Sequence, residues 1–208
     1  MSAEVSIYGK LPAHGDYILV SLPSTLEAQI HRWLSAVIVE AESVLGKESW
    51  LKAFLMTPPV CFVLNLNTKP QKSLFGVMIP SVDKVGRYFP LMTGVYLNKH
   101  FTLSELDREV LDKLANAIVN EQVTVMHEYQ PVDMLVKKIM NLTELENIKA
   151  VLQTASSHIS TPALHTLKQR PILSSCWWEL DNPNPGIEAN ELPSVTYYQS
   201  ILSRGAHQ

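Results

Sequence analysis

The sequence carries little charge of either sign, and this shortage narrows the possible partners. Charged residues make up 18% of its 208 residues, and the formal net charge is -3. Lysine and arginine are scattered, with only Lys137 and Lys138 adjacent. A chain of this kind lacks the basic stripe that neutralises the phosphates of nucleic acid. We therefore expect no nucleic-acid partner.

Long apolar runs and cysteines are scarce as well. The most apolar stretch, VCFVL at 60–64, is far shorter than the roughly 20 residues that span a bilayer. The first residues, MSAEVSIYGK, show neither the basic leader nor the apolar segment of a secretion signal. The two cysteines, Cys61 and Cys176, are then expected to be reduced, buried thiols. These features predict a cytoplasmic protein with no direct membrane insertion.

Recognisable catalytic and metal-binding motifs are missing too. None of the seven histidines lies in an H-E-x-x-H pattern, and no zinc-finger spacing or G-x-S-x-G element occurs. Gly9-Lys10 is followed by Leu11, and no glycine lies five residues before Gly9, so the phosphate-binding Walker A loop is incomplete. Pro162 separates His158 from His165 and prevents a shared helical face. We expect no cofactor, no metal and no enzymatic activity.

Apolar residues make up 46% of the sequence, which is typical of a globular chain. Their spacing in the first third of the sequence predicts three secondary-structure elements. A short strand is expected over 4–8. Spacing of three to four residues predicts a long helix from Ser24 to about Gly46, with Ser24 and Glu27 as a capping box. A shorter helix over 48–55, with Trp50, Phe54 and Leu55 facing inward, should stop at Pro58-Pro59.

Three strand-like runs follow, at 60–66, 73–79 and 87–97. The segments between them are too short for a crossover helix, so consecutive strands should pair antiparallel. Their nearly continuous apolar character indicates a sheet covered on both faces. Pro90, inside the third run, implies an edge position, a bulge or a break in that strand.

The second half is mainly helical in pattern. Helices are expected from a capping box at 102–105 through Ile118, over 132–142 and over 143–155, and a last one over 194–202 with Tyr197 or Tyr198 facing inward. A strand over 173–180 precedes a turn at 181–186. Its neighbouring residues Trp177 and Trp178 should point to opposite faces of the sheet. We favour the interpretation that both faces of the sheet are covered and both indoles are buried. The alternative is that one indole is exposed and binds a partner.

Several blocks of this sequence resemble one known family. YGKLPAHGDYI at 8–18 is similar to the signature G-K-L-P-x-x-G-D-F of the type VI secretion-associated TagF (ImpM) proteins, with Tyr17 in place of phenylalanine. GVMIPSVDKVGRYFPL at 76–91 resembles their G-V-x-x-P-S-x-D-x-x-G-R-x-F-P-L block, and SCWW at 175–178 their S-x-W-W element. ELPSVTYYQSIL at 191–202 resembles their closing segment, with Glu191 where glycine is common.

This resemblance implies a fold and a role. The fold is a three-layer α/β/α sandwich with a mainly antiparallel central sheet, in a single TagF-like domain over 1–208. The role is that of a cytoplasmic accessory protein of the type VI secretion system, which typically represses assembly or firing after translation. The implied partner is the forkhead-associated scaffold protein or another component of the system. The motif positions, expected to be structural or partner-binding, are Gly9, Lys10, Leu11, Pro12, Gly15, Asp16, Pro80, Ser81, Asp83, Gly86, Arg87, Phe89, Pro90, Trp177 and Trp178.

Three hypotheses for the function follow. The first is a non-enzymatic regulator that binds a secretion-system component. The second is a hydrolase or phosphotransferase that uses polar loops around Asp16 and Asp83, with His14 and Lys10. The third is a stoichiometric subunit of the injector's baseplate.

For the motif itself we expect a mainly structural role. Gly9, Gly15, Gly86 and Pro80 should shape backbone turns, because glycine tolerates a positive φ and proline fixes φ. Arg87 is expected to pair with Asp16 or Asp83 and so to join the two motif loops. Residues 9–23 would then act as a strut more than as a docking surface.

Overall fold

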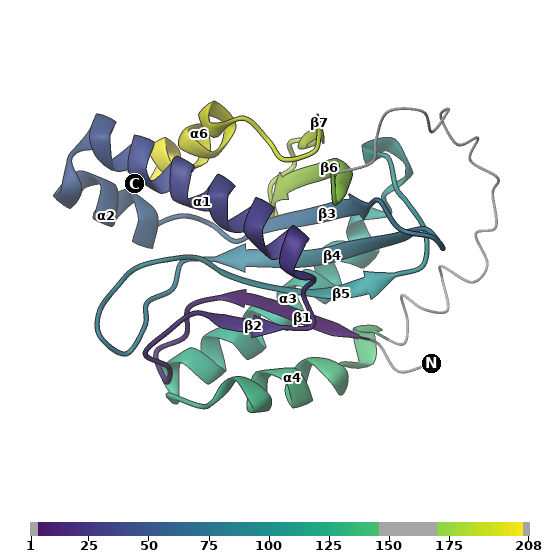
Figure 1. Ribbon diagram of the computed structural model, residues 1–208, viewed down its shortest axis with the longest axis horizontal. Coiled ribbons are helices and arrows are strands. Elements are labelled where there is room, and N and C mark those ends of the chain that lie inside the picture. The colour runs from purple at the N-terminus through teal and green to yellow at the C-terminus, as the bar shows by residue number, and fades with distance from the viewer. Residues whose placement is uncertain (1–3, 146–169, 206–208) are drawn as a thin grey trace.

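The chain folds into three layers, with helices on both faces of one sheet. The structure, a computed structural model, describes residues 4–145 and 170–205. Figure 1 shows one helical layer above the sheet and another below it. The upper layer consists of α1 (Ser24–Leu45), α2 (Lys47–Leu55) and α6 (Val195–Gly205). The lower layer consists of α3 (Arg108–His127) and α4 (Val132–Met140). The expected α/β/α sandwich is confirmed.

The sheet has seven strands in the order β2-β1-β5-β4-β3-β6-β7, and every neighbouring pair is antiparallel. The strands are β1 (Val5–Gly9), β2 (Ile18–Val20), β3 (Val60–Leu66), β4 (Lys72–Ile79), β5 (Leu91–Leu97), β6 (Ile172–Glu179) and β7 (Ile187–Asn190). The tight connections place β3, β4 and β5 side by side, as predicted. Pro90 precedes the first residue of β5, so it breaks the expected run 87–97 and leaves residues 87–90 in a loop.

Two separate cores, one on each face of the sheet, explain the nearly continuous apolar strands. Along β3, Phe62 packs with the cluster under α1, α2 and α6, whereas Cys61 and Val63 pack with the cluster over α3 and α4. In β6, Trp177 enters the first cluster and Trp178 the second. Both indole rings are buried, so the interpretation with two covered faces is confirmed.

The ends of the helices differ in detail from the predictions. Helix α1 begins at Ser24 itself, after Pro23, and no side chain caps it; the predicted Ser24–Glu27 capping box is wrong. Leu55, expected to face inward, is exposed at the end of α2. The capping box of Thr102 and Glu105 does form, but around a short 3-10 turn, η1 (Leu103–Glu105). Helix α3 begins separately, capped by Asp107.

Four further outcomes concern the edge strands, the last helix, the helix predicted over 143–155 and the two cysteines. The edge strands β2 and β7 were not predicted, since they have only three and four residues. In the last helix, the inward tyrosine is Tyr198. The helix predicted over 143–155 lies outside the described residues from position 146 onward. Cys61 and Cys176 are free and buried, as expected.

Candidate functional site

The two motif loops lie at the same end of the sheet, and the strand register explains why. In the β1–β5 pair Gly9 lies opposite Leu91, and in the β4–β5 pair Ile79 lies opposite Leu91. The last residue of β1, the last of β4 and the first of β5 therefore share one row. The loop after β1 (residues 10–17) and the loop between β4 and β5 (80–90) must leave the sheet together.

Gly9 is required where these loops cross. Its φ is +132°, and a Cβ added there would overlap the carbonyl oxygen of Pro90. Such a conformation favours glycine, because a side chain would meet backbone that cannot move aside. The predicted conformational role of Gly9 is confirmed, and Gly86, with a φ of +87°, confirms the same role in the second loop.

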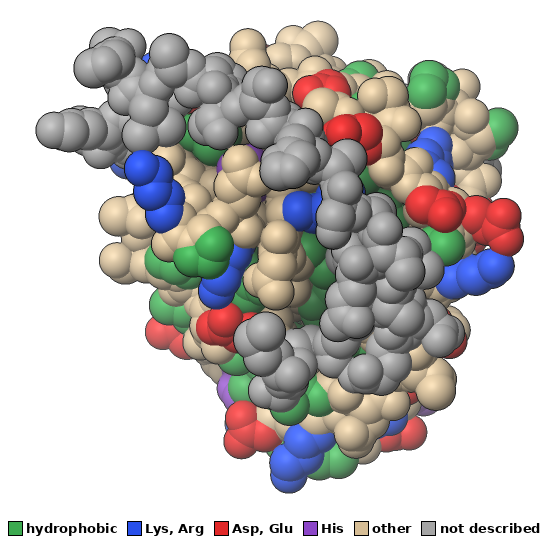
Figure 2. All heavy atoms as spheres, turned by 90° about the vertical axis from the view of Figure 1, so that its right-hand side faces the viewer, with side chains coloured by type: hydrophobic (Ala, Val, Ile, Leu, Met, Phe, Trp, Pro, Cys, Tyr) green, Lys and Arg blue, Asp and Glu red, His purple; other side chains and the backbone are tan. Residues whose placement is uncertain are grey.

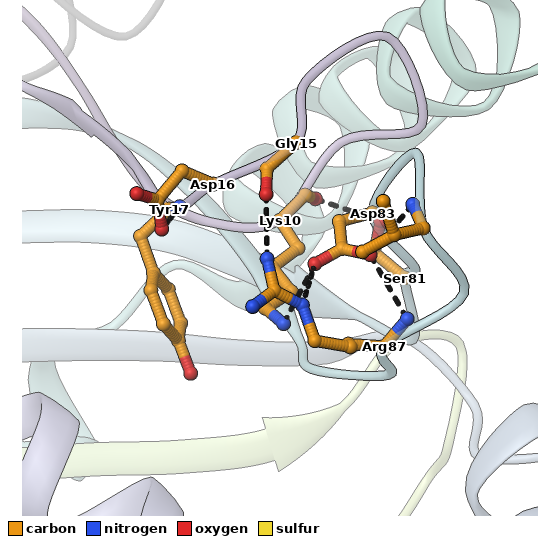
Figure 3. Close-up of polar contacts among 8 residues, drawn as sticks. Lys10, Gly15, Asp16, Tyr17, Ser81, Asp83 and Arg87 are labelled. Atoms are coloured by element: carbon orange, nitrogen blue, oxygen red, sulfur yellow. Dashed lines mark hydrogen bonds and ion pairs between the residues drawn. The ribbon is translucent and has the colours of Figure 1, made fainter.

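The carboxylate of Asp83 lies at the centre of the junction (Figure 3). It is buried and accepts hydrogen bonds from the Lys10 ammonium at 2.9 Å and from the Arg87 Nε at 2.7 Å. The backbone N–H groups of Val85 and Arg87 donate to its other oxygen, at 3.0 and 2.9 Å. Four donors thus surround one carboxylate, and the Lys10 side chain is itself buried beside it. Arg87 therefore pairs with Asp83, one of its two expected partners.

Electrostatics keep this carboxylate ionised. Burial alone would raise the pKa of Asp83. The backbone N–H of Arg87, the Lys10 ammonium, the Arg87 guanidinium and the N–H of Val85 outweigh burial and hold the pKa well below its usual range. A carboxylate that is stabilised as the anion and already fully hydrogen-bonded is a poor general acid or base.

Further hydrogen bonds connect the backbones of the two loops. Ser81 Oγ donates to the carbonyl of Lys10 at 2.7 Å, and the N–H of Lys84 donates to the carbonyl of His14 at 2.8 Å. Arg87 also donates to the carbonyl of Gly15 at 2.5 Å. The two loops therefore form one connected unit, hereafter the motif junction (residues 10–17 and 80–90).

Asp16 does not join this network. Its exposed carboxylate accepts a hydrogen bond from the N–H of Tyr17 at 2.8 Å, and Figure 3 shows it directed away from Asp83. Gly15 has no positive φ, and a Cβ there would meet nothing within 4 Å. The predicted turn-forming requirement for glycine at position 15 is therefore wrong. The ring of His14 accepts a hydrogen bond from the N–H of Val132 at 3.0 Å and ties the loop to the start of α4.

A cluster of aromatic rings attaches the first loop to α1. Tyr8, Tyr17, His31 and Phe89 pack with ring centroids 5.0 to 6.3 Å apart. Burial raises the pKa of Tyr8, with a smaller effect of Glu27, so the phenol keeps its proton, and its hydroxyl forms a hydrogen bond with His31 Nδ1 at 2.5 Å. The partnership of Tyr8 and His31 is not evident from the sequence, because the two residues are 23 positions apart and give no local signal.

The remaining motif positions have structural contacts. Leu11 is fully buried, and Pro80 follows the last residue of β4. The indole of Trp178 donates to Asp112 at 2.7 Å, and that of Trp177 donates to Ser175 at 2.8 Å. Glu191 has a φ of +67°, which explains why glycine suits this position.

A hollow of about 490 Å³ opens at the surface of the motif junction. It lies between the two loops and the turn that joins α3 to α4. The residues that line it are Pro12, Ala13, Val82, Asp83, Lys84, Gly86 and Tyr129. Tyr129 was not singled out from the sequence, since nothing local marks an isolated exposed tyrosine at a helix end.

No metal site or membrane span accompanies the junction in the part of the chain that the structure describes. Within residues 4–145 and 170–205, no three His, Cys, Asp or Glu side chains gather as metal ligands would. None of the helices described there combines the length and the hydropathy needed to cross a bilayer. At the opposite end of the sheet, Figure 2 shows Lys and Arg side chains scattered among Asp and Glu, without a continuous basic surface over the described residues.

Comparison with known proteins assigns the family. Residues 6–142 match the family described as "TagF N-terminal domain, Type VI secretion system-associated". This chain belongs to that family. The match includes both loops of the motif junction, so the resemblance seen in the sequence is confirmed and the protein is associated with the type VI secretion system.

The fold of this TagF-family protein also matches a solved structure. The crystal structure of PA0076 from Pseudomonas aeruginosa PAO1 is similar with a TM-score of 0.63 and 21% sequence identity. The similarity covers 95% of this chain and 93% of that chain, and at this identity it concerns the fold alone. A search of curated proteins found no match.

Proposed function

We propose that this TagF-family protein is a cytoplasmic, non-enzymatic regulator that restrains the assembly or firing of the type VI secretion system by binding a component of it. The expected partner is the forkhead-associated scaffold protein or a core subunit. We infer a single domain over residues 1–208, because β6, β7 and α6 complete the same sheet and helical layer as the segment before them.

The state of Asp83 is the observation that carries this proposal. The buried carboxylate of the motif accepts hydrogen bonds from four donors, which stabilise it as the anion and make it a poor acceptor of a proton from a substrate. Asp16, the other carboxylate considered for catalysis, is exposed and lies outside this network. The motif thus builds a fixed surface in a family associated with secretion, and a fixed surface suits recognition of a protein.

Sequestration supplies a simple mechanism. A protein that binds a free subunit lowers its concentration and shifts the assembly equilibrium toward the disassembled state. Such repression needs no covalent chemistry. It requires only that the complex form at the cellular concentrations of both proteins.

A pull-down tests the proposal. Full-length tagged protein is expressed in cells that contain an active secretion cluster, and the co-purified proteins are identified by mass spectrometry. Recovery of the forkhead-associated protein or a core subunit, together with reduced secretion on overproduction, supports regulation by binding. Unchanged secretion and no apparatus component in the eluate would contradict it.

The alternatives are distinguished in the same cells. A baseplate subunit would be present at fixed stoichiometry in purified apparatus, whereas a sequestering regulator would be absent from that preparation. An enzyme would lose its effect with Asp16→Asn, although this substitution should leave the fold intact. Repression that survives Asp16→Asn therefore favours the regulator.

A further inference from the structure

The hollow at the motif junction has the features of a docking site for another protein. We propose that it binds an acidic segment of the partner, with one aromatic or branched apolar side chain inserted between Pro12, Val82 and Tyr129 and a carboxylate paired with Lys84. This inference rests on the proposed function and assigns it a surface. The motif junction is then both a strut and, on its outer side, a docking surface.

Hydrogen bonds hold the two loops of the hollow together before anything binds. The bonds from Lys84 to His14, from Arg87 to Gly15 and from Ser81 to Lys10 fix its two loops relative to each other. Binding to a preformed surface avoids the entropy loss of ordering loops. Its volume of about 490 Å³ falls within the range of roughly 300–1,000 Å³ of ligand-binding clefts.

The lining favours a peptide segment over a small polar ligand. Pro12, Ala13, Val82 and Tyr129 offer apolar contact. The oxygens of Asp83, the buried charge in the wall, already accept four hydrogen bonds. Most affinity must therefore come from an apolar side chain, and the open side of the hollow admits one that projects from a larger molecule.

Tyr129 is placed as a binding residue would be. Its side chain is 71% exposed, and Val85, on the tip of the second loop, is 67% exposed. Tyr129 has a φ of +52° just after α3, in a conformation where helices usually have glycine. The tyrosine therefore occupies this turn against backbone preference, at a cost of about 1 kcal/mol. Tyrosine is enriched among the few residues that carry most of the binding energy of protein interfaces.

Charge favours an acidic partner. Asp83 is neutralised by Lys10 and Arg87 within the wall, and the Lys84 ammonium has no ion pair among the described residues. The side chain of Arg87 is itself 56% exposed.

Two acidic residues belong to the segments that form the hollow, Asp16 in the first loop and Glu128 next to Tyr129, but neither lines it. The Asp16 carboxylate is directed away from Asp83 (Figure 3), and the Glu128 carboxylate accepts a hydrogen bond from the Gln130 amide at 2.6 Å. Lys84 is thus the cation of the lining that is available to a partner's carboxylate.

Two variants test the surface without unfolding the protein. Tyr129→Gly removes the ring and relaxes the backbone, so its melting temperature should stay unchanged or rise slightly. Lys84→Glu reverses the exposed charge. Each should weaken binding of the apparatus subunit recovered by wild-type protein about tenfold or more, whereas Leu55→Ala and Lys52→Glu on α2 should bind as wild type.

A photoreactive benzoylphenylalanine at position 129, but not at 55, should crosslink to an acidic segment of that subunit.

Each outcome decides the matter. Loss of binding in both junction variants with a crosslink at 129 supports the docking site. If wild-type protein recovers the subunit but the junction variants bind equally well, or the crosslink arises at 55, the docking site is wrong while the proposed function stands. A crosslink at 129 to a second copy of this chain also overturns it. Recovery of no apparatus subunit refutes the proposed function, and the docking site with it.

Discussion

Lys10 and Asp83, 73 residues apart in the chain, form a buried ion pair with 2.9 Å between Nζ and Oδ2. Lysine is almost never fully buried without a partner, and removing either member leaves an uncompensated charge in the interior. The pair therefore makes the loop after β1 and the loop before β5 depend on each other, and several measurable consequences follow.

Substituting Asp83 should destabilise the protein strongly. Asp83→Asn leaves Lys10 buried without a counter-ion and should lower the free energy of unfolding by about 3 kcal/mol. Asp16→Asn, in an adjacent but exposed position, should change it by less than about 0.5 kcal/mol. Urea unfolding followed by circular dichroism measures both. Equal stability of the two variants would show that the buried pair does not hold the loops together.

The same pair gives a defined dependence on pH. Because the folded pKa of Asp83 is lowered, its contribution to the free energy of unfolding is fully present above the unfolded pKa of about 3.9. The contribution is lost as the pH falls through the folded value. The stability difference between wild type and Asp83→Asn should thus be constant from about pH 5 to 8 and shrink below about pH 4. A difference that shrinks instead above pH 6 would contradict this assignment.

Gly9 and Gly15 should respond differently to the same substitution. Gly9→Ala places a Cβ against the carbonyl of Pro90 at a φ of +132° and should destabilise by about 2 kcal/mol or more. Gly15→Ala meets nothing within 4 Å and should be within about 0.5 kcal/mol of wild type. Thermal unfolding of the two variants provides the comparison. A melting temperature of Gly9→Ala equal to that of wild type would be inconsistent with the close approach to Pro90.

These two glycines also show what the sequence could and could not predict. Both belong to one motif, yet only Gly9 has the special conformation, because the demand arises from a strand that lies opposite it across the sheet. Two kinds of element were predictable, the long helices α1 and α3 and the antiparallel meander of β3, β4 and β5. The spacing of apolar residues predicts the helices and the short connections predict the meander, and both are local properties of the sequence. The short edge strands β2 and β7 depend on pairing with distant residues and were missed.

The candidate site was predictable to the same extent. Motif matching identified Lys10, Asp83 and Arg87, and the expectation that Arg87 binds a carboxylate was confirmed with Asp83. The partnership of Tyr8 with His31 and the position of Tyr129 beside the hollow come from tertiary packing alone. No spacing within the sequence indicates them.

The two thiols should be unreactive in the folded protein. Burial raises the pKa of Cys61 well above its ordinary value and that of Cys176 to about 12, so the reactive thiolate is scarce at neutral pH. A thiol reagent such as dithionitrobenzoate should label neither cysteine in native protein and both in urea. Rapid labelling of native protein would show that one face of the sheet opens.

The dose dependence of repression tests the central claim most directly. The cellular amount of this protein is varied against that of its recovered target, and secretion of the apparatus's own secreted subunits is measured at each ratio. Binding without catalysis predicts that secretion falls in proportion to the ratio and is fully repressed only near one copy per target. Full repression at a small fraction of a copy per target would indicate turnover and contradict a sequestering regulator.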